Sequence, residues 1–77
     1  MSRLPLATAR EVIKVLNKIG WTVDRQKGSH VILTKSGSIF NIVVPDHGGT
    51  EIKRSLLKKI IKEAEITEDW FCKLLHD

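Results

Sequence analysis

The residues best suited to chemistry in this chain are four consecutive ones, Lys27, Gly28, Ser29 and His30. A glycine beside a serine lets the backbone approach a phosphate closely, because glycine has no Cβ in the way. The lysine adds positive charge, and imidazole is the side chain that most readily exchanges a proton near physiological pH. Together they could bind a phosphate and move a proton beside it.

Cleavage of RNA is the reaction that these groups would serve. RNA carries an internal nucleophile, its 2′-hydroxyl, and a neutral His30 could take the hydroxyl proton as the oxygen attacks the adjacent phosphate. The reaction needs no metal and leaves a 2′,3′-cyclic phosphate and a 5′-hydroxyl. Lys27 and Arg25 could stabilise the charge that develops on the phosphate. His47 could protonate the leaving 5′-oxygen.

Each of these residues also has a purely structural interpretation. His30 could be a strand-edge histidine that fills a hydrogen bond, the Gly-Ser pair could form only a tight turn, and His47 could be an exposed loop residue. A metal site built from these two histidines with Asp46 and Glu51 is not expected, because their spacing matches no closed zinc pattern. We therefore expect neither a metal nor another cofactor.

Three helices are predicted around this segment. Thr8 and Glu11 form a capping box, and apolar residues at i, i+3, i+4 and i+7 then predict a helix over about residues 9–19. Ser55 is expected to cap a second helix, and Thr67 a third, short one. The apolar faces comprise Val12, Val15, Leu16 and Ile19 in the first helix and Leu57, Ile60, Ile61 and Ala64 in the second.

Three short strands are predicted between the first two helices, over residues 21–26, 30–35 and 39–44. The Gly28-Ser29 and Ser36-Gly37 turns are short enough to join antiparallel neighbours. The order is therefore α-β-β-β-α with a short C-terminal helix. It predicts an α+β fold, a two-layer sandwich with helices on one face of a three-stranded sheet.

The sequence allows two orientations for the second strand of this sheet. Asn41 marks the outer side of the third strand. In the second strand, either Val31 and Leu33 or Ile32 could face inward. We favour Ile32, which would turn His30 toward the helical layer near the edge of the sheet. Elsewhere, the expected inner face comprises Val23, Phe40, Ile42 and Val44.

The composition is that of a small soluble globular protein. The 77 residues suffice for one domain, expected over residues 1–77, with a modest core. The single cysteine, Cys72, excludes an internal disulfide, and no apolar run is long enough to cross a membrane. The N-terminal residues are too few and too polar for a secretory leader, so we expect a cytoplasmic protein.

The net charge of +4 is unevenly distributed. Residues 1–59 hold eleven Lys and Arg against four acids, whereas residues 60–77 hold two against five. A basic body of this kind favours a polyanionic partner such as RNA, although a solvated surface on a small basic protein is the alternative. The cations around the second helix that could bind phosphates are Lys53, Arg54, Lys58, Lys59 and Lys62.

Four short motifs follow one another along the chain: Gly20-Trp21, Arg25-Gln26-Lys27-Gly28-Ser29-His30, Val44-Pro45-Asp46-His47 and Glu51-Ile52-Lys53-Arg54. Together with the order of elements, they resemble the HicA-type (YcfA-like) toxins of bacterial and archaeal toxin–antitoxin pairs over about residues 7–75. Two positions depart from the family pattern. Many members carry Gly-Thr where this chain has Ser55-Leu56, and many carry Gly where it has Glu65.

The resemblance implies a double-stranded-RNA-binding-domain-like fold, ribonuclease activity on messenger RNA (mRNA) and inhibition by a HicB-type antitoxin. The family's essential histidine corresponds to His30, and its glycine and serine correspond to Gly28 and Ser29. We thus expect a metal-independent endoribonuclease with His30 as general base and His47 as a candidate second acid or base. The alternative is a non-catalytic RNA-binding or protein-interaction module. The expected RNA-binding residues are Arg25, Lys27, Gly28, Ser29, Lys53, Arg54 and Lys58.

Overall fold

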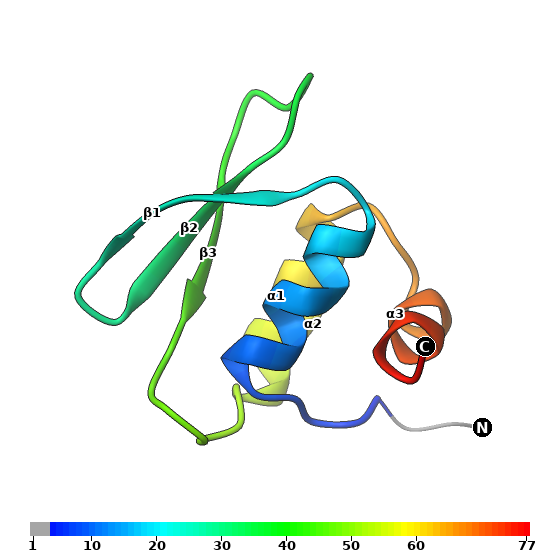
Figure 1. The fold of residues 1–77 in the computed structure, drawn as a ribbon. Coiled ribbons are helices and arrows are strands. Elements are labelled where there is room, and N and C mark those ends of the chain that lie inside the picture. The colour runs from blue at the N-terminus through cyan, green and yellow to red at the C-terminus, as the bar shows by residue number, and fades with distance from the viewer. Residues whose placement is uncertain (1–3) are drawn as a thin grey trace.

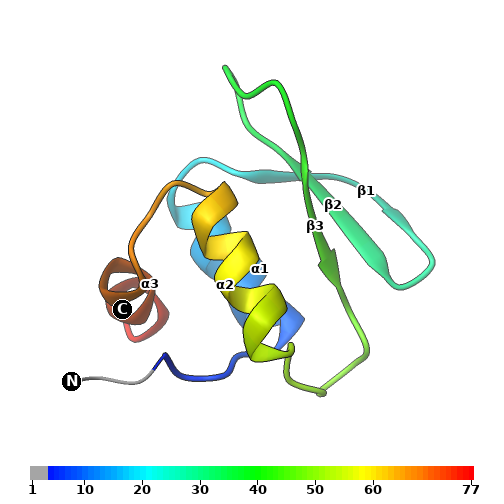
Figure 2. The ribbon, with the colours of Figure 1, turned by 180° about the vertical axis from the view of Figure 1, so that it is seen from behind.

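The computed structural model describes residues 4–77, so the expected domain of residues 1–77 begins outside them. The elements follow in the order α1 (Ala9–Lys18), β1 (Thr22–Lys27), β2 (His30–Thr34), β3 (Ile42–Pro45), α2 (Arg54–Glu63) and α3 (Glu68–Leu75). The strands form one antiparallel sheet in the order β1-β2-β3, and the helices gather on one side of it, with α3 farthest away (Figure 1, Figure 2). The predicted α+β sandwich, which is double-stranded-RNA-binding-domain-like, is confirmed. Within residues 4–77, no helix combines the length and the apolar character needed to cross a bilayer.

The predicted capping box starts α1. The Thr8 side chain accepts a hydrogen bond from the Glu11 backbone N–H at 3.3 Å, and the Glu11 carboxylate accepts one from the Thr8 N–H at 2.9 Å. After the helix, Gly20 takes a φ of +101°, and the Trp21 N–H donates to the Leu16 carbonyl at 3.0 Å. These contacts turn the chain toward β1. The helix is predicted over about residues 9–19 and is observed over Ala9–Lys18, so the predicted bounds are correct to within one residue.

The start of α2 differs from the prediction. The sequence predicts a Ser55 cap, whereas the N-cap is Lys53 without a side-chain hydrogen bond, and Ser55 lies in the first turn. Long-range contacts set this boundary instead. The Ile52 N–H donates to the Ala7 carbonyl at 2.8 Å, and the Arg54 guanidinium donates to the backbone carbonyl of the N-terminal segment at Leu4.

The end of α2 is a left-handed residue that is not glycine. Glu65 has a φ of +59°. Its N–H donates to the Lys62 carbonyl at 3.0 Å, and the Ile66 N–H donates to the Ile61 carbonyl at 3.3 Å. These are the two hydrogen bonds of a Schellman motif. Because the left-handed conformation costs a residue with a Cβ roughly 1–2 kcal/mol, Glu65 is a strained position.

We expect the substitution Glu65→Gly to raise the free energy of unfolding by about 0.5–1 kcal/mol. Glycine adopts a positive φ without strain, which stabilises the folded state. Glycine also raises the conformational entropy of the unfolded chain, and this reduces the net stabilisation. Urea unfolding of both proteins measures the difference. Glu63→Gly is the matched control, because it places glycine inside the last turn of the helix, where it should destabilise. A loss of stability in Glu65→Gly would argue against this cap geometry.

The core face of the sheet is only partly as predicted. Ile42 and Val44 are fully buried, as expected. Val31 pairs with Val44 and Leu33 pairs with Ile42, so these two β2 residues face the core, and the favoured inward orientation of Ile32 is wrong. Since β2 is the central strand and all three residues are buried, its apolar run is continuous and does not reveal which face is inside.

Val23 and Phe40, also predicted inside, are 50% and 42% exposed. All of β1 is exposed, because this edge strand extends beyond the cover of the helices (Figure 1). β3 begins at Ile42 instead of Ile39, so Phe40 belongs to the β2–β3 loop. There its ring lies 6.2 Å from that of Trp21, centroid to centroid.

α3 completes the core. The predicted Thr67 cap is present, with the hydroxyl accepting from the Trp70 N–H at 3.0 Å. Phe71 is 1% exposed and belongs to the same core cluster as the sheet residues. At the other end of α3, the Lys18 ammonium of α1 donates to the Leu74 carbonyl at 2.7 Å and to the Asp77 carbonyl at 3.1 Å. A cation is favourable at this helix end, so it ties α3 to α1.

Candidate functional site

The turn between β1 and β2 presents the four residues that the sequence singles out. Lys27 and His30 pair across the hairpin, and Gly28 and Ser29 form the loop between them. Gly28 has a φ of +59°, while the φ of Ser29 is not positive, which is the pattern of a type II′ turn. No atom lies within 4 Å of a Cβ built on Gly28, so the turn conformation, not crowding, requires glycine.

His30 lies on the face of the sheet opposite the core. It is exposed, and its cross-strand partners on this open face are Lys27 and Pro45. Directly opposite residues have Cβ atoms about 4.5–5.5 Å apart, so Lys27 and His30 are brought together. Arg25 pairs with Ile32 and occupies the next row of this face. The strand register thus places His30 on the face away from the core, and at the β3 edge it still shares a hollow with residues of α2.

Arg25 follows a bulge in β1. The register shifts between Val23 and Arg25, which leaves Asp24 as the additional residue. The Arg25 guanidinium forms an ion pair with the Asp24 carboxylate, and both side chains are about half exposed. Exposed ion pairs contribute only about 0–1 kcal/mol, so a phosphate can compete for this guanidinium.

A hollow of about 250 Å³ lies beside His30. The hollow lies where β3, an edge strand of the sheet, meets α2. Because Leu57 and Ile60 point into the core, the α2 residues that reach this hollow form a row along one flank of the helix. The lining residues are His30, Asn41, Val43 and Pro45 from the sheet side and Leu56, Lys59 and Glu63 from α2.

Of the cations that the sequence indicates for RNA binding, only Lys59 lines this hollow. Lys58 is exposed one residue before Lys59, about 100° away around the helix, and Arg54 is engaged with the Leu4 carbonyl. Lys53 lines a separate hollow of about 270 Å³. The structure thus gathers Arg25, Lys27 and His30 on one face and leaves Lys53, Arg54 and Lys58 outside it.

His47 is exposed in the loop after β3 and lines the hollow of Lys53. The start of this loop is fixed beside the turn, because the Asp46 N–H donates to the Ser29 carbonyl at 2.6 Å. The Asp46 carboxylate also accepts from the Gly48 N–H at 3.1 Å. His47 thus follows a residue bonded to the turn but does not share the hollow of His30. Among residues 4–77, no three His, Cys, Asp or Glu side chains are placed to hold a metal ion.

The family of the chain follows from comparison with known proteins. The family model described as HicA toxin of bacterial toxin-antitoxin matches residues 9–66. The chain belongs to the HicA toxin family. A solved structure titled "HicA3 and HicB3 toxin-antitoxin complex" contains a chain 32% identical to this one, with 79% of this chain and 97% of that chain covered and a TM-score of 0.64. No curated protein gave a significant match.

Membership of the HicA family confirms the resemblance. The structure adds Asn41 to the site and shows which of the cations around α2 lies beside His30. Lys59 and Asn41 line the hollow beside His30. Besides the cluster of cations around α2, the sequence signal for Lys59 is the spacing of Leu56, Lys59 and Glu63 at i, i+3 and i+7 beside the apolar stripe. That spacing does not reveal that β3 lies against this flank of the helix.

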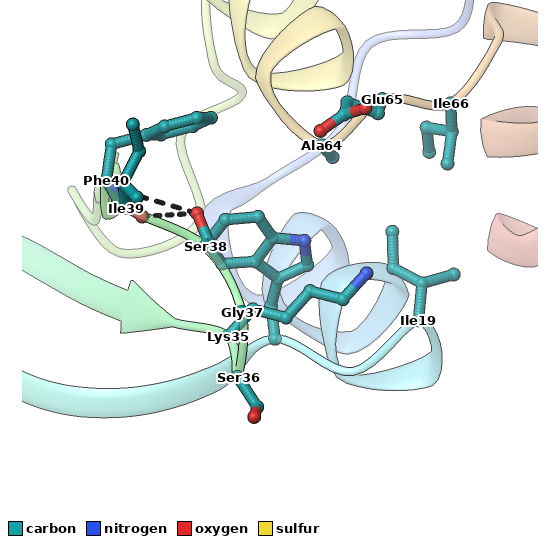
Figure 3. Close-up of a pocket in the computed structure, with 11 residues that line it drawn as sticks. Ile19, Lys35, Ser36, Gly37, Ser38, Ile39, Phe40, Ala64, Glu65 and Ile66 are labelled. Atoms are coloured by element: carbon teal, nitrogen blue, oxygen red, sulfur yellow. Dashed lines mark hydrogen bonds between the residues drawn. The ribbon is translucent and has the colours of Figure 1, made fainter.

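This HicA toxin has a second, larger hollow of about 460 Å³. It lies between the end of α1, the β2–β3 loop and the α2–α3 turn (Figure 3). Trp21 lines it, and the Nε1 of this indole is buried without a hydrogen-bond partner. Figure 3 shows the Ser38 hydroxyl bonded to the Phe40 backbone, at 2.8 Å to the carbonyl and 3.3 Å to the N–H. This hollow contains none of the predicted site residues.

Proposed function

We propose that this HicA-family toxin is an endoribonuclease that cleaves mRNA, with His30 as its general base. The observation that carries the proposal is the position of His30: exposed on the open face, directly opposite Lys27 and at the rim of a hollow. An extended RNA strand can reach an exposed sheet face without any rearrangement of the core. A base and a cation in adjacent positions are what transesterification at a phosphate requires.

In the proposed reaction, His30 accepts the proton of the 2′-hydroxyl as the 2′-oxygen forms a bond to phosphorus. The bond from phosphorus to the 5′-oxygen breaks, and that oxygen takes up a proton. Lys27 stabilises the charge on the non-bridging oxygens, where a fixed cation acts most strongly. The open hollow admits water for the leaving-group proton, and His47 is the alternative donor. The products are a 2′,3′-cyclic phosphate and a 5′-hydroxyl, and no metal takes part.

The remaining cations extend RNA binding beyond the reacting phosphate. Arg25 lies in the row next to Lys27 and His30 and would bind a neighbouring phosphate. Lys53 and Lys58 are exposed on other sides of α2, where they would bind phosphates farther along the strand. Arg54 would have to leave the Leu4 carbonyl to do so.

A toxic ribonuclease requires an inhibitor in its own cell, and the partner we propose is a HicB-type antitoxin. The related HicA3 chain was solved in a complex with HicB3. The basic surface of residues 1–59 favours an acidic partner, since complementary charge speeds association. Association that weakens steeply with salt would agree with this electrostatic contribution.

The proposed activity predicts a specific set of products. Incubated with a single-stranded RNA and EDTA, the protein should release fragments with 2′,3′-cyclic phosphate and 5′-hydroxyl ends, detectable by mass spectrometry. The same RNA with 2′-O-methyl groups throughout should bind but stay intact, because it lacks the nucleophile. Binding of the unmodified RNA without cleavage would favour the non-catalytic module, and fragments with 5′-phosphate ends would rule out attack by the 2′-hydroxyl.

A further inference from the structure

Lys59 lies on the wall of the hollow that faces His30. It lies on α2 in the row formed with Leu56 and Glu63, and Val43 and Pro45 of β3 line the same hollow. Leu57 and Ile60, which flank Lys59 in sequence, are 0% and 1% exposed. They anchor this turn of the helix in the core, so the backbone that carries Lys59 is held rigidly.

The Lys59 ammonium is available to a ligand. Within residues 4–77, no carboxylate lies within ion-pair distance of it, although Glu63 lines the same hollow one helical turn further on. The rest of the lining is mostly apolar, with Val43, Pro45 and Leu56.

We propose that Lys59 is a further catalytic residue, which contacts the scissile phosphate from α2 while Lys27 contacts it from β1. The inference rests on the proposed ribonuclease activity and adds to it a residue from a different element of the fold. The volume of about 250 Å³ lies below the roughly 300 Å³ at which small-molecule pockets begin. It suits one phosphate with its ribose, in contact with Lys59 and next to His30.

Both cations would act on charge that grows during the reaction. The phosphate gains negative charge on its non-bridging oxygens as the 2′-oxygen attacks, so a cation placed there favours the transition state over the bound RNA. Lys59 also offsets the Glu63 carboxylate, which would otherwise repel a phosphate from the hollow. Loss of Lys59 should therefore slow the reaction more than it weakens RNA binding.

The test compares kcat and KM for one short RNA among the parent protein, Lys59→Ala, Lys59→Arg and the control Lys14→Ala. Lys14 is an exposed lysine on α1, a different helix. Lys59→Ala should lower kcat by about tenfold to 100-fold. Removal of one oxyanion-hole donor lowers kcat by about 100-fold to 1000-fold, so the expected effect reaches at most the lower end of that range. The Kd for the 2′-O-methyl RNA should change less than about threefold, and Lys59→Arg should recover most of kcat. Unchanged melting temperatures would establish that the variants fold.

A kcat for Lys59→Ala within twofold of the parent would overturn the inference, and so would an equal loss in Lys14→Ala. A loss confined to KM would also overturn it, because it would reduce Lys59 to general attraction of RNA. Failure of the underlying activity looks different: a parent protein that binds RNA without cleaving it would overturn the proposed function together with this inference.

Discussion

Replacing His30 with alanine should lower kcat for RNA cleavage by about 10²–10⁴-fold, the usual contribution of a general base. The fold should survive, because His30 is exposed and, among residues 4–77, no hydrogen bond involves its ring. RNA binding should change little, since the cations Lys27 and Arg25 stay in place. Cleavage rates with EDTA present, the Kd for 2′-O-methyl RNA and the melting temperature are the three measurements.

The control for this experiment is His76→Ala. His76 is an exposed histidine at the C-terminal end of α3 and has no part in the proposed site. A His30→Ala protein that cleaves RNA at the parent rate would eliminate His30 as the base.

The second large effect concerns stability: Phe71→Ala should lower the free energy of unfolding by about 3–5 kcal/mol. The Phe71 ring is 1% exposed in the core, so its removal leaves a cavity that the neighbouring helices fill only in part. A domain is typically stable by about 5–15 kcal/mol, so this one change removes a large share. Chemical unfolding followed by circular dichroism measures it.

Trp70→Ala provides a matched control in the same helix. Trp70 is the residue before Phe71 but is 44% exposed, and the Lys73 ammonium lies 5.3 Å from the centroid of its ring. An exposed contact of this kind contributes about 0.5–1 kcal/mol. Equal losses in the two variants would show that α3 is not docked through Phe71. The test is informative because the match to the family model ends at residue 66, before α3 begins.

Features that depend on neighbours in the chain could be predicted from the sequence. The Thr8 and Thr67 caps and the Gly28 turn all appear where their residues indicate. Each involves hydrogen bonds or backbone angles within about four residues, so local residue types are sufficient. The Ser55 cap failed because the start of α2 is set by contacts with the N-terminal segment, far away in sequence.

The sequence by itself determined the α-β-β-β-α order, the hairpin that carries His30 and the family. Only the tertiary structure decided which way His30 faces and what lies across from it. The apolar run of β2 is the same on both faces, so its orientation follows from the pairing of Val31 with Val44. Lys59 joins His30 only because α2 packs beside β3, a contact between segments separated by a long loop. Such contacts depend on how whole helices and strands pack against one another, and the spacing of residues along the chain does not predict that packing.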